Sequence, residues 1–114
     1  MWDIEYYELA TGKCPVEEFI DSLDAKSRAK VARTLDLMEE FGTNLGMPYA
    51  KLIEKKLWEL RIRHTGNQYR IIYFLYTGQT FVLLHGFTKK TRAIPRADIE
   101  IAESRFNDYL SRRR

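Results

Sequence analysis

Three apolar stretches between residues 57 and 87, separated by short polar turns, constrain the fold of this chain more than any other feature. Residues 57–63 alternate between apolar and charged side chains, which is typical of a β-strand with one buried face. Residues 69–76 and 80–87 are apolar on both faces, as central strands are. The joins at 64–68 and 77–79 are short and contain glycine. The pattern predicts three strands linked by hairpins.

Two helices are predicted before these strands. Pro15 suits the first position of a short helix over residues 15–23, and Asp24 caps a longer helix that Gly42 ends. Apolar residues recur in the longer helix at spacings of three or four and predict its buried stripe, which comprises Ala29, Ala32, Leu35, Met38 and Phe41.

The remaining segments complete the predicted fold. Residues 2–9 are rich in aromatic and β-branched side chains and favour a first strand, 43–50 have the composition of a loop, and 95–110 indicate a closing helix. The predicted order is β-α-α-β-β-β-α in one domain of residues 1–114. We therefore expect an α+β fold in which the helical pair packs on one face of a twisted, mainly antiparallel sheet.

Charge is distributed unevenly along the chain. Residues 51–96 hold ten Lys or Arg and two Glu, a balance of +8, whereas residues 1–50 hold five basic and ten acidic residues, a balance of −5. Clustered positive charge is the electrostatic signature of a polyanion-binding protein. We expect a shared phosphate-binding surface formed by Arg61, Arg63, Arg70, Lys89, Lys90, Arg92 and Arg96. The alternative, that Arg61 and Arg63 are the solvated face of an amphipathic strand, stays open.

Such a cluster can support cleavage of RNA, in which the 2′-hydroxyl attacks the adjacent phosphorus and a 2′,3′-cyclic phosphate forms. Arginine binds phosphate oxygens bidentately and stabilises the charge that develops on them. A histidine, or a lysine whose pKa is lowered by neighbouring cations, can transfer the protons. His85 is either a catalytic or a partly buried structural residue, and His64 is either an exposed turn residue or a substrate contact.

The other reactive or aromatic side chains point to structural roles. Trp58 is expected in the core, and Tyr69 and Tyr73 are expected to pack in the sheet. Cys14 has no second cysteine to pair with and is interpreted as inert. The sequence lacks zinc-ligand spacing, a glycine-rich phosphate loop and a Gly-x-Ser-x-Gly turn, so neither a metal ion nor a cofactor is expected. Without a signal peptide or an apolar stretch of roughly 20 residues, a cytoplasmic protein without membrane association is expected.

The order and spacing of the motifs resemble the RelE/ParE toxin superfamily, and specifically its phage-derived, HigB-like branch. The resemblance rests on Leu57-Trp58-Glu59-Leu60-Arg61, Tyr69-Arg70-Ile71-Ile72-Tyr73, and Leu84-His85-Gly86-Phe87-Thr88-Lys89-Lys90-Thr91 with the following Pro95. It implies the toxin of a type II toxin–antitoxin system, an mRNA interferase that cleaves mRNA in the ribosomal A site and so inhibits translation.

The implied active-site positions are Arg61, Arg63, Arg70, Lys89 and Lys90. RelE itself has lysines at the first two positions, and its C-terminal tyrosine has no counterpart because Arg96 aligns with it. By analogy with HigB toxins, which use histidines, the resemblance offers His85 or His64 for proton transfer.

The resemblance also implies partners. A helix-turn-helix antitoxin similar to HigA is expected to bind the toxin, and operator DNA is expected to bind only through that complex. The ribosome and mRNA are the expected targets. The same fold also carries ParE-like inhibitors of DNA gyrase, which are not nucleases, and decayed relatives that only bind a partner. Both alternatives stay open at the level of sequence.

Overall fold

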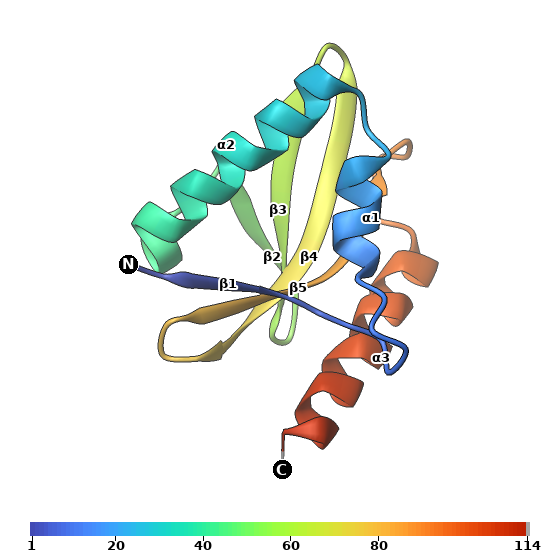
Figure 1. Ribbon diagram of the computed structural model, residues 1–114. Helices are drawn as coiled ribbons and strands as arrows, with labels where there is room; N and C mark the ends of the chain where they lie inside the picture. The colour runs from blue at the N-terminus through green and yellow to red at the C-terminus, as the bar shows by residue number, and fades with distance from the viewer. Residues whose placement is uncertain (114) are drawn as a thin grey trace.

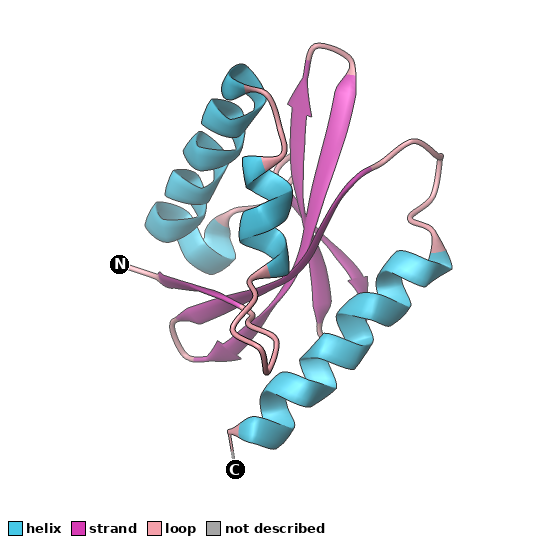
Figure 2. Cartoon of the chain, turned by 45° about the vertical axis from the view of Figure 1, so that its right-hand side comes forward, coloured by secondary structure: helices cyan, strands magenta, loops and turns pink. Residues whose placement is uncertain are grey.

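The computed structural model describes residues 1–113 and shows a five-stranded sheet with helices on both faces (Figures 1 and 2). The elements are, in chain order, β1 (Asp3–Tyr6), α1 (Pro15–Asp21), α2 (Ala25–Phe41), a short 3-10 helix η1 (Gly42–Asn44), β2 (Ala50–Glu54), β3 (Leu57–His64), β4 (Asn67–Thr77), β5 (Thr80–Thr88) and α3 (Arg96–Arg112). The predicted α+β class is confirmed. No helix of the described residues is long and apolar enough to cross a membrane.

The sheet has the strand order β1-β5-β4-β3-β2 and is mainly antiparallel, as predicted. The strands β2, β3, β4 and β5 form successive antiparallel pairs, and β1 joins the other edge parallel to β5. The three predicted hairpin-linked strands correspond to β3, β4 and β5. The prediction missed β2, because a register shift between Leu52 and Glu54 interrupts the alternation by which a strand is recognised.

The helices α1 and α2 cover one face of the sheet, as predicted. Of the predicted stripe of α2, Met38 is buried and Leu35 is partly buried against the core, whereas Ala29, Ala32 and Phe41 are exposed. The observed stripe is Ser27, Val31, Thr34 and Met38. The two hydroxyls are buried because each is hydrogen-bonded: Ser27 Oγ lies 3.0 Å from Tyr69 Oη, and Thr34 Oγ1 donates to the Lys30 carbonyl at 2.9 Å. Ala29 and Ala32, which the apolar spacing placed in the stripe, face solvent. Burial of an alanine side chain removes little apolar area from water, so their exposure costs little.

The closing helix α3 packs on the opposite face (Figure 2), and Glu103 of α3 lies 3.8 Å from Lys55 in the β2–β3 turn. Phe74 lies at the centre of this layer, with its ring centroid 4.6 Å from that of Phe106 and 5.7 Å from that of Tyr109. The expectation of helices on a single face was therefore incomplete. Because α3 covers only part of its face, the end of the sheet at the β3–β4 turn stays open on that side (Figure 1).

Trp58 does not belong to the core, contrary to prediction. It is 38% exposed and pairs across the strands with Leu52, which is 48% exposed, where α2 no longer covers the sheet. Tyr69 and Tyr73 are buried as predicted, and burial raises the pKa of Tyr73 to about 12.

Candidate nucleic-acid interface

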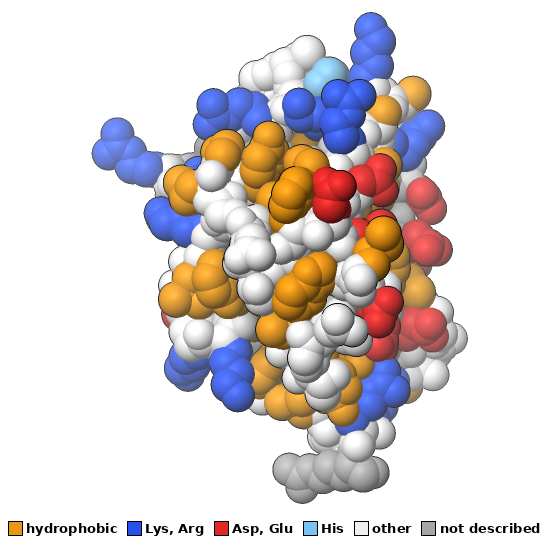
Figure 3. Space-filling model, turned by 90° about the vertical axis from the view of Figure 1, so that its left-hand side faces the viewer, with side chains coloured by type: hydrophobic (Ala, Val, Ile, Leu, Met, Phe, Trp, Pro, Cys, Tyr) orange, Lys and Arg blue, Asp and Glu red, His pale blue; other side chains and the backbone are white. Residues whose placement is uncertain are grey.

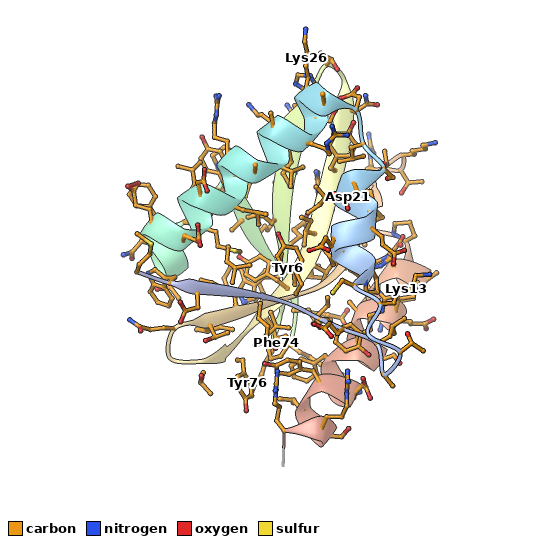
Figure 4. The ribbon with its side chains drawn as sticks, viewed as in Figure 1. Tyr6, Lys13, Asp21, Lys26, Phe74 and Tyr76 are labelled. Carbon is orange, nitrogen blue, oxygen red and sulfur yellow. The ribbon has the colours of Figure 1, made fainter. Side chains whose placement is uncertain are left out.

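Basic side chains gather at the end of the sheet formed by the β3–β4 turn. Figure 3 shows Lys and Arg side chains along the top of one face, exposed hydrophobic side chains below them, and Asp and Glu along the right-hand edge. Lys26, in the first turn of α2, lies at this end, whereas Phe74 and Tyr76 lie toward the opposite end with α3 (Figure 4). Lys and Arg side chains also lie at the lower edge of this face, so basic residues gather at the β3–β4 end without being confined to it.

A hollow of about 390 Å³ lies at this end, where α2, the segment before β2, and strands β3 and β4 meet. We call it the basic hollow; its lining includes Lys30, Met47, Tyr49, Arg61, Arg63 and Arg70. Three predicted arginines therefore share one depression. The sequence did not predict Lys30, Met47 or Tyr49 as lining residues. Lys30 is one of several charged residues on the solvent side of α2, and nothing in the sequence distinguishes it from the others. Met47 and Tyr49 lie in a loop that carries no recognisable motif.

Arg70 is the buried centre of the cluster. Its side chain is 2% exposed, and its Nε donates to Glu59 Oε1 at 2.7 Å. The terminal nitrogens donate to the Tyr69 carbonyl at 3.1 Å and to Gln68 Oε1 at 2.8 Å. A buried guanidinium requires such partners because desolvation of an unpaired charge is costly. Arg70 therefore supplies positive charge and fixes its neighbours, while three of its five N–H donors are already engaged.

Arg61 and Arg63 supply the accessible guanidinium groups. Arg61 lies opposite Arg70 in the β3–β4 register, and its side chain is 26% exposed. Its Nε is 3.7 Å from Glu59 Oε1, and its Nη1 donates to Met47 Sδ at 3.4 Å. A thioether is a weak acceptor, so most of this donor fork remains available to an anion. Arg63 is exposed and forms no hydrogen bond or ion pair through its side chain within residues 1–113.

Lys89 and Lys90 line an adjoining hollow of about 320 Å³ at the β3–β4 turn. The backbone N–H of Lys89 donates to the Gln68 carbonyl at 2.7 Å, and the Gln68 side chain accepts from Arg70, so hydrogen bonds connect a residue of each hollow. Partial burial lowers the pKa of Lys89, and the charges of Arg70 and Arg61 act in the same direction. The predicted single depression is therefore divided: the arginines lie in the basic hollow, and Lys89 and Lys90 lie in a second hollow beside it.

His85 lies outside both hollows, between β5 and α3. Its Nε2 is 2.7 Å from Asp98 Oδ1, and its Nδ1 is 3.4 Å from Arg105 Nη1. Burial lowers the pKa of His85, although Asp98 opposes that effect. In the neutral tautomer that this network assigns, Nε2–H donates to Asp98 and Nδ1 accepts from Arg105. Of the two interpretations of His85, the geometry fits the structural one.

The remaining predicted contacts are dispersed. Arg96 pairs with Glu54 at 2.8 Å and joins the start of α3 to β2, away from the basic hollow. Arg92 is exposed in the segment after β5, where its carbonyl accepts from Lys89 at 2.8 Å. His64 ends β3 at the basic end, near Asp24 at the start of α2.

Two groups outside the basic cluster complete the chemical description. Burial raises the pKa of the Cys14 thiol, and Glu8 and the first turn of α1 act in the same direction, which agrees with an inert cysteine. Among residues 1–113, no three His, Cys, Asp or Glu side chains lie together as a possible set of metal ligands.

The fold and its basic end define a small α+β protein with a basic surface at one end of its sheet. The family model of phage derived protein Gp49-like (DUF891) matches residues 18–107, which is most of the chain, and the chain belongs to this family. The family is part of the RelE/ParE-like toxin superfamily, so the predicted superfamily is confirmed and a toxin is consistent with it. No curated protein matches the chain.

Proposed function

We propose that this protein is the HigB-like toxin of a type II toxin–antitoxin system and that it cleaves ribosome-bound mRNA. One observation carries the proposal: Arg61 and Arg63, from one strand, meet the buried Arg70 of the next strand in a single hollow, and Lys89 lines the adjoining hollow. Membership of the RelE/ParE-like superfamily supports it.

The proposed reaction uses the substrate's own 2′-hydroxyl as nucleophile. Arg61 and Arg63 bind the oxygens of the scissile phosphate and stabilise the charge of the phosphorane; one well-placed donor contributes about 3–4 kcal/mol to lowering such a barrier. As the 2′ oxygen bonds to phosphorus and the P–O5′ bond breaks, the 2′ proton passes to solvent water, and Lys89, whose pKa is lowered, is the candidate to give its proton to the 5′ leaving oxygen. Glu59 accepts a hydrogen bond from Arg70 and so fixes the position of the buried positive charge beside the site.

Primer extension on mRNA from expressing cells tests the proposal. The wild type should produce cuts at fixed codon positions, and the Arg61→Ala and Arg63→Ala variants should lose them. Lys56→Ala is the charge-matched control, because Lys56 lies in the β2–β3 turn at the other end of β3, and it should cut normally. In a purified ribosome reaction, a 2′-deoxynucleotide at the cut site should stop cleavage.

Three outcomes would contradict the proposal. Arrested growth with uncut mRNA, together with inhibition of purified gyrase, would establish the ParE-like alternative. Normal growth on induction without an antitoxin would identify a decayed relative that only binds a partner. Cuts that persist in an Arg61→Ala/Arg63→Ala double variant would remove the basic hollow from the mechanism.

We also propose a helix-turn-helix antitoxin, similar to HigA, as the partner through which operator DNA is bound. The superfamily and the exposed positive end, which suits an acidic protein segment, support this proposal. Co-expression with the product of the neighbouring open reading frame should yield a stable complex and restore growth. Independent purification of the two proteins with undiminished toxicity would contradict it.

A further inference from the structure

The segment before β2 exposes large apolar side chains beside the basic hollow. Met47 is 62% exposed and Tyr49 is 39% exposed, and both line the hollow that holds Arg61 and Arg63. Neither belongs to the two hydrophobic clusters of the core. A surface that combines exposed apolar side chains with cations is complementary to a ligand that has an apolar part and an anionic part.

The backbone fixes this segment against β3. The Arg61 N–H donates to the Tyr49 carbonyl at 2.7 Å, and the next residue, Ala50, pairs with Leu60. The Tyr49 N–H donates to the Gly46 carbonyl at 2.9 Å. Met47 Sδ accepts from the Arg61 guanidinium at 3.4 Å. An aromatic ring, a thioether and a guanidinium are therefore held together on adjacent chain segments.

We propose that Met47 and Tyr49 form a nucleobase subsite, in which one unstacked base of single-stranded RNA rests on Tyr49 while its phosphate is bound by Arg61 and Arg63. This inference rests on the proposed function and specifies how the substrate is held. A nucleotide joins an aromatic base to an anionic phosphate, which matches this lining. Every base presents a π-face, so stacking on an aromatic side chain tolerates any sequence. Bases within a duplex are stacked on each other and cannot use the subsite.

Fluorescence anisotropy with a labelled, single-stranded 2′-O-methyl oligoribonucleotide, which cannot be cleaved, tests the subsite on the purified full chain. Tyr49→Ala should weaken binding roughly tenfold, since one base stack has about that value, whereas Tyr49→Phe should bind as the wild type. Trp58→Ala is the matched control, because Trp58 is 38% exposed but does not line the basic hollow. It should bind normally. Circular dichroism of each variant establishes that the fold is intact.

The same oligonucleotide annealed to its complement provides the second arm. Tyr49→Ala should leave binding of the duplex unchanged, because only the phosphates are then in contact. Unchanged single-strand affinity for Tyr49→Ala, an equal loss for Trp58→Ala, or an equal loss on the duplex would each overturn the subsite. So would a wild type that binds no RNA. Tyr49-dependent binding without ribosomal cleavage would support the subsite while contradicting the nuclease.

Discussion

Replacing Arg70 with methionine should destabilise the protein more than replacing any exposed arginine. Arg70 is 2% exposed, and its Nε is 2.7 Å from a Glu59 carboxylate whose side chain is 10% exposed. In the Arg70→Met variant that carboxylate loses its closest cation and remains buried. Removing one partner of a buried ion pair costs about 3–5 kcal/mol, chiefly because the other charge is left uncompensated.

The expected value lies at the lower end of this range. The Nε of Arg61 is 3.7 Å from the same carboxylate and still neutralises part of its charge. A loss of about 3 kcal/mol can be converted to a temperature, because unfolding has an entropy of about 2.1 cal/mol/K per residue. For 114 residues this is about 0.24 kcal/mol/K, so the midpoint of thermal unfolding should fall by about 12 °C.

Thermal and urea denaturation followed by circular dichroism measure the effect. Arg63→Met is the control and should change stability by less than about 0.5 kcal/mol, because Arg63 is exposed. The double variant Glu59→Leu/Arg70→Met should recover most of the loss, since no unpaired charge then remains. An Arg70→Met protein as stable as Arg63→Met, or strictly additive losses in the double variant, would refute the structural role of the pair.

Three further predictions concern the helices and their packing. Because burial lowers the pKa of His85 in the folded state, the unfolded chain binds a proton more readily, and the free energy of unfolding should fall as the pH drops below 6.5. Urea denaturation at several pH values should show a smaller decrease in this free energy for a His85→Gln variant. Gly86→Ala would place a Cβ 2.5 Å from a ring carbon of Phe19 in α1 and should cost about 1–3 kcal/mol, with partial recovery in Phe19→Leu/Gly86→Ala; an unchanged melting midpoint would contradict this packing. Ser27→Ala should cost about 1–3 kcal/mol by leaving the Tyr69 hydroxyl unpaired, whereas Ser27→Ala/Tyr69→Phe should be closer to wild type.

The fold was predictable where local signals and tertiary packing agree. The Asp24 cap and the Gly42 stop define α2, because the Asp24 carboxylate accepts from the Ser27 N–H at 2.7 Å and Gly42 adopts a φ of +53°. The buried face of α2 was not predictable from apolar spacing. That face includes Ser27, whose hydroxyl bonds to Tyr69 on β4, and a contact between residues so far apart in sequence leaves no local signal.

The sequence predicts that basic residues cluster at the site, but it does not predict the role of each residue. Alternation in β3 and the short β3–β4 turn place Arg61 opposite Arg70, so their proximity follows from the sequence. Burial of Arg70 depends on its ion pair with Glu59, and a count of charges along residues 51–96 does not reveal that pairing. The proposed subsite depends on how the irregular segment with Met47 and Tyr49 packs against β3. Neither a periodic pattern nor a sequence motif predicts the conformation of that segment.

The salt dependence of RNA binding tests most directly whether the basic hollow binds the phosphate backbone of RNA. For single strands, the slope of log affinity against log salt concentration changes by about 0.7 for each phosphate contact. Arg61→Ala and Arg63→Ala should each reduce the slope of the wild type by about 0.7, and the double variant by about 1.4, while Lys56→Ala leaves it unchanged. Equal slopes for the wild type and the double variant would show that these arginines do not contact the RNA backbone.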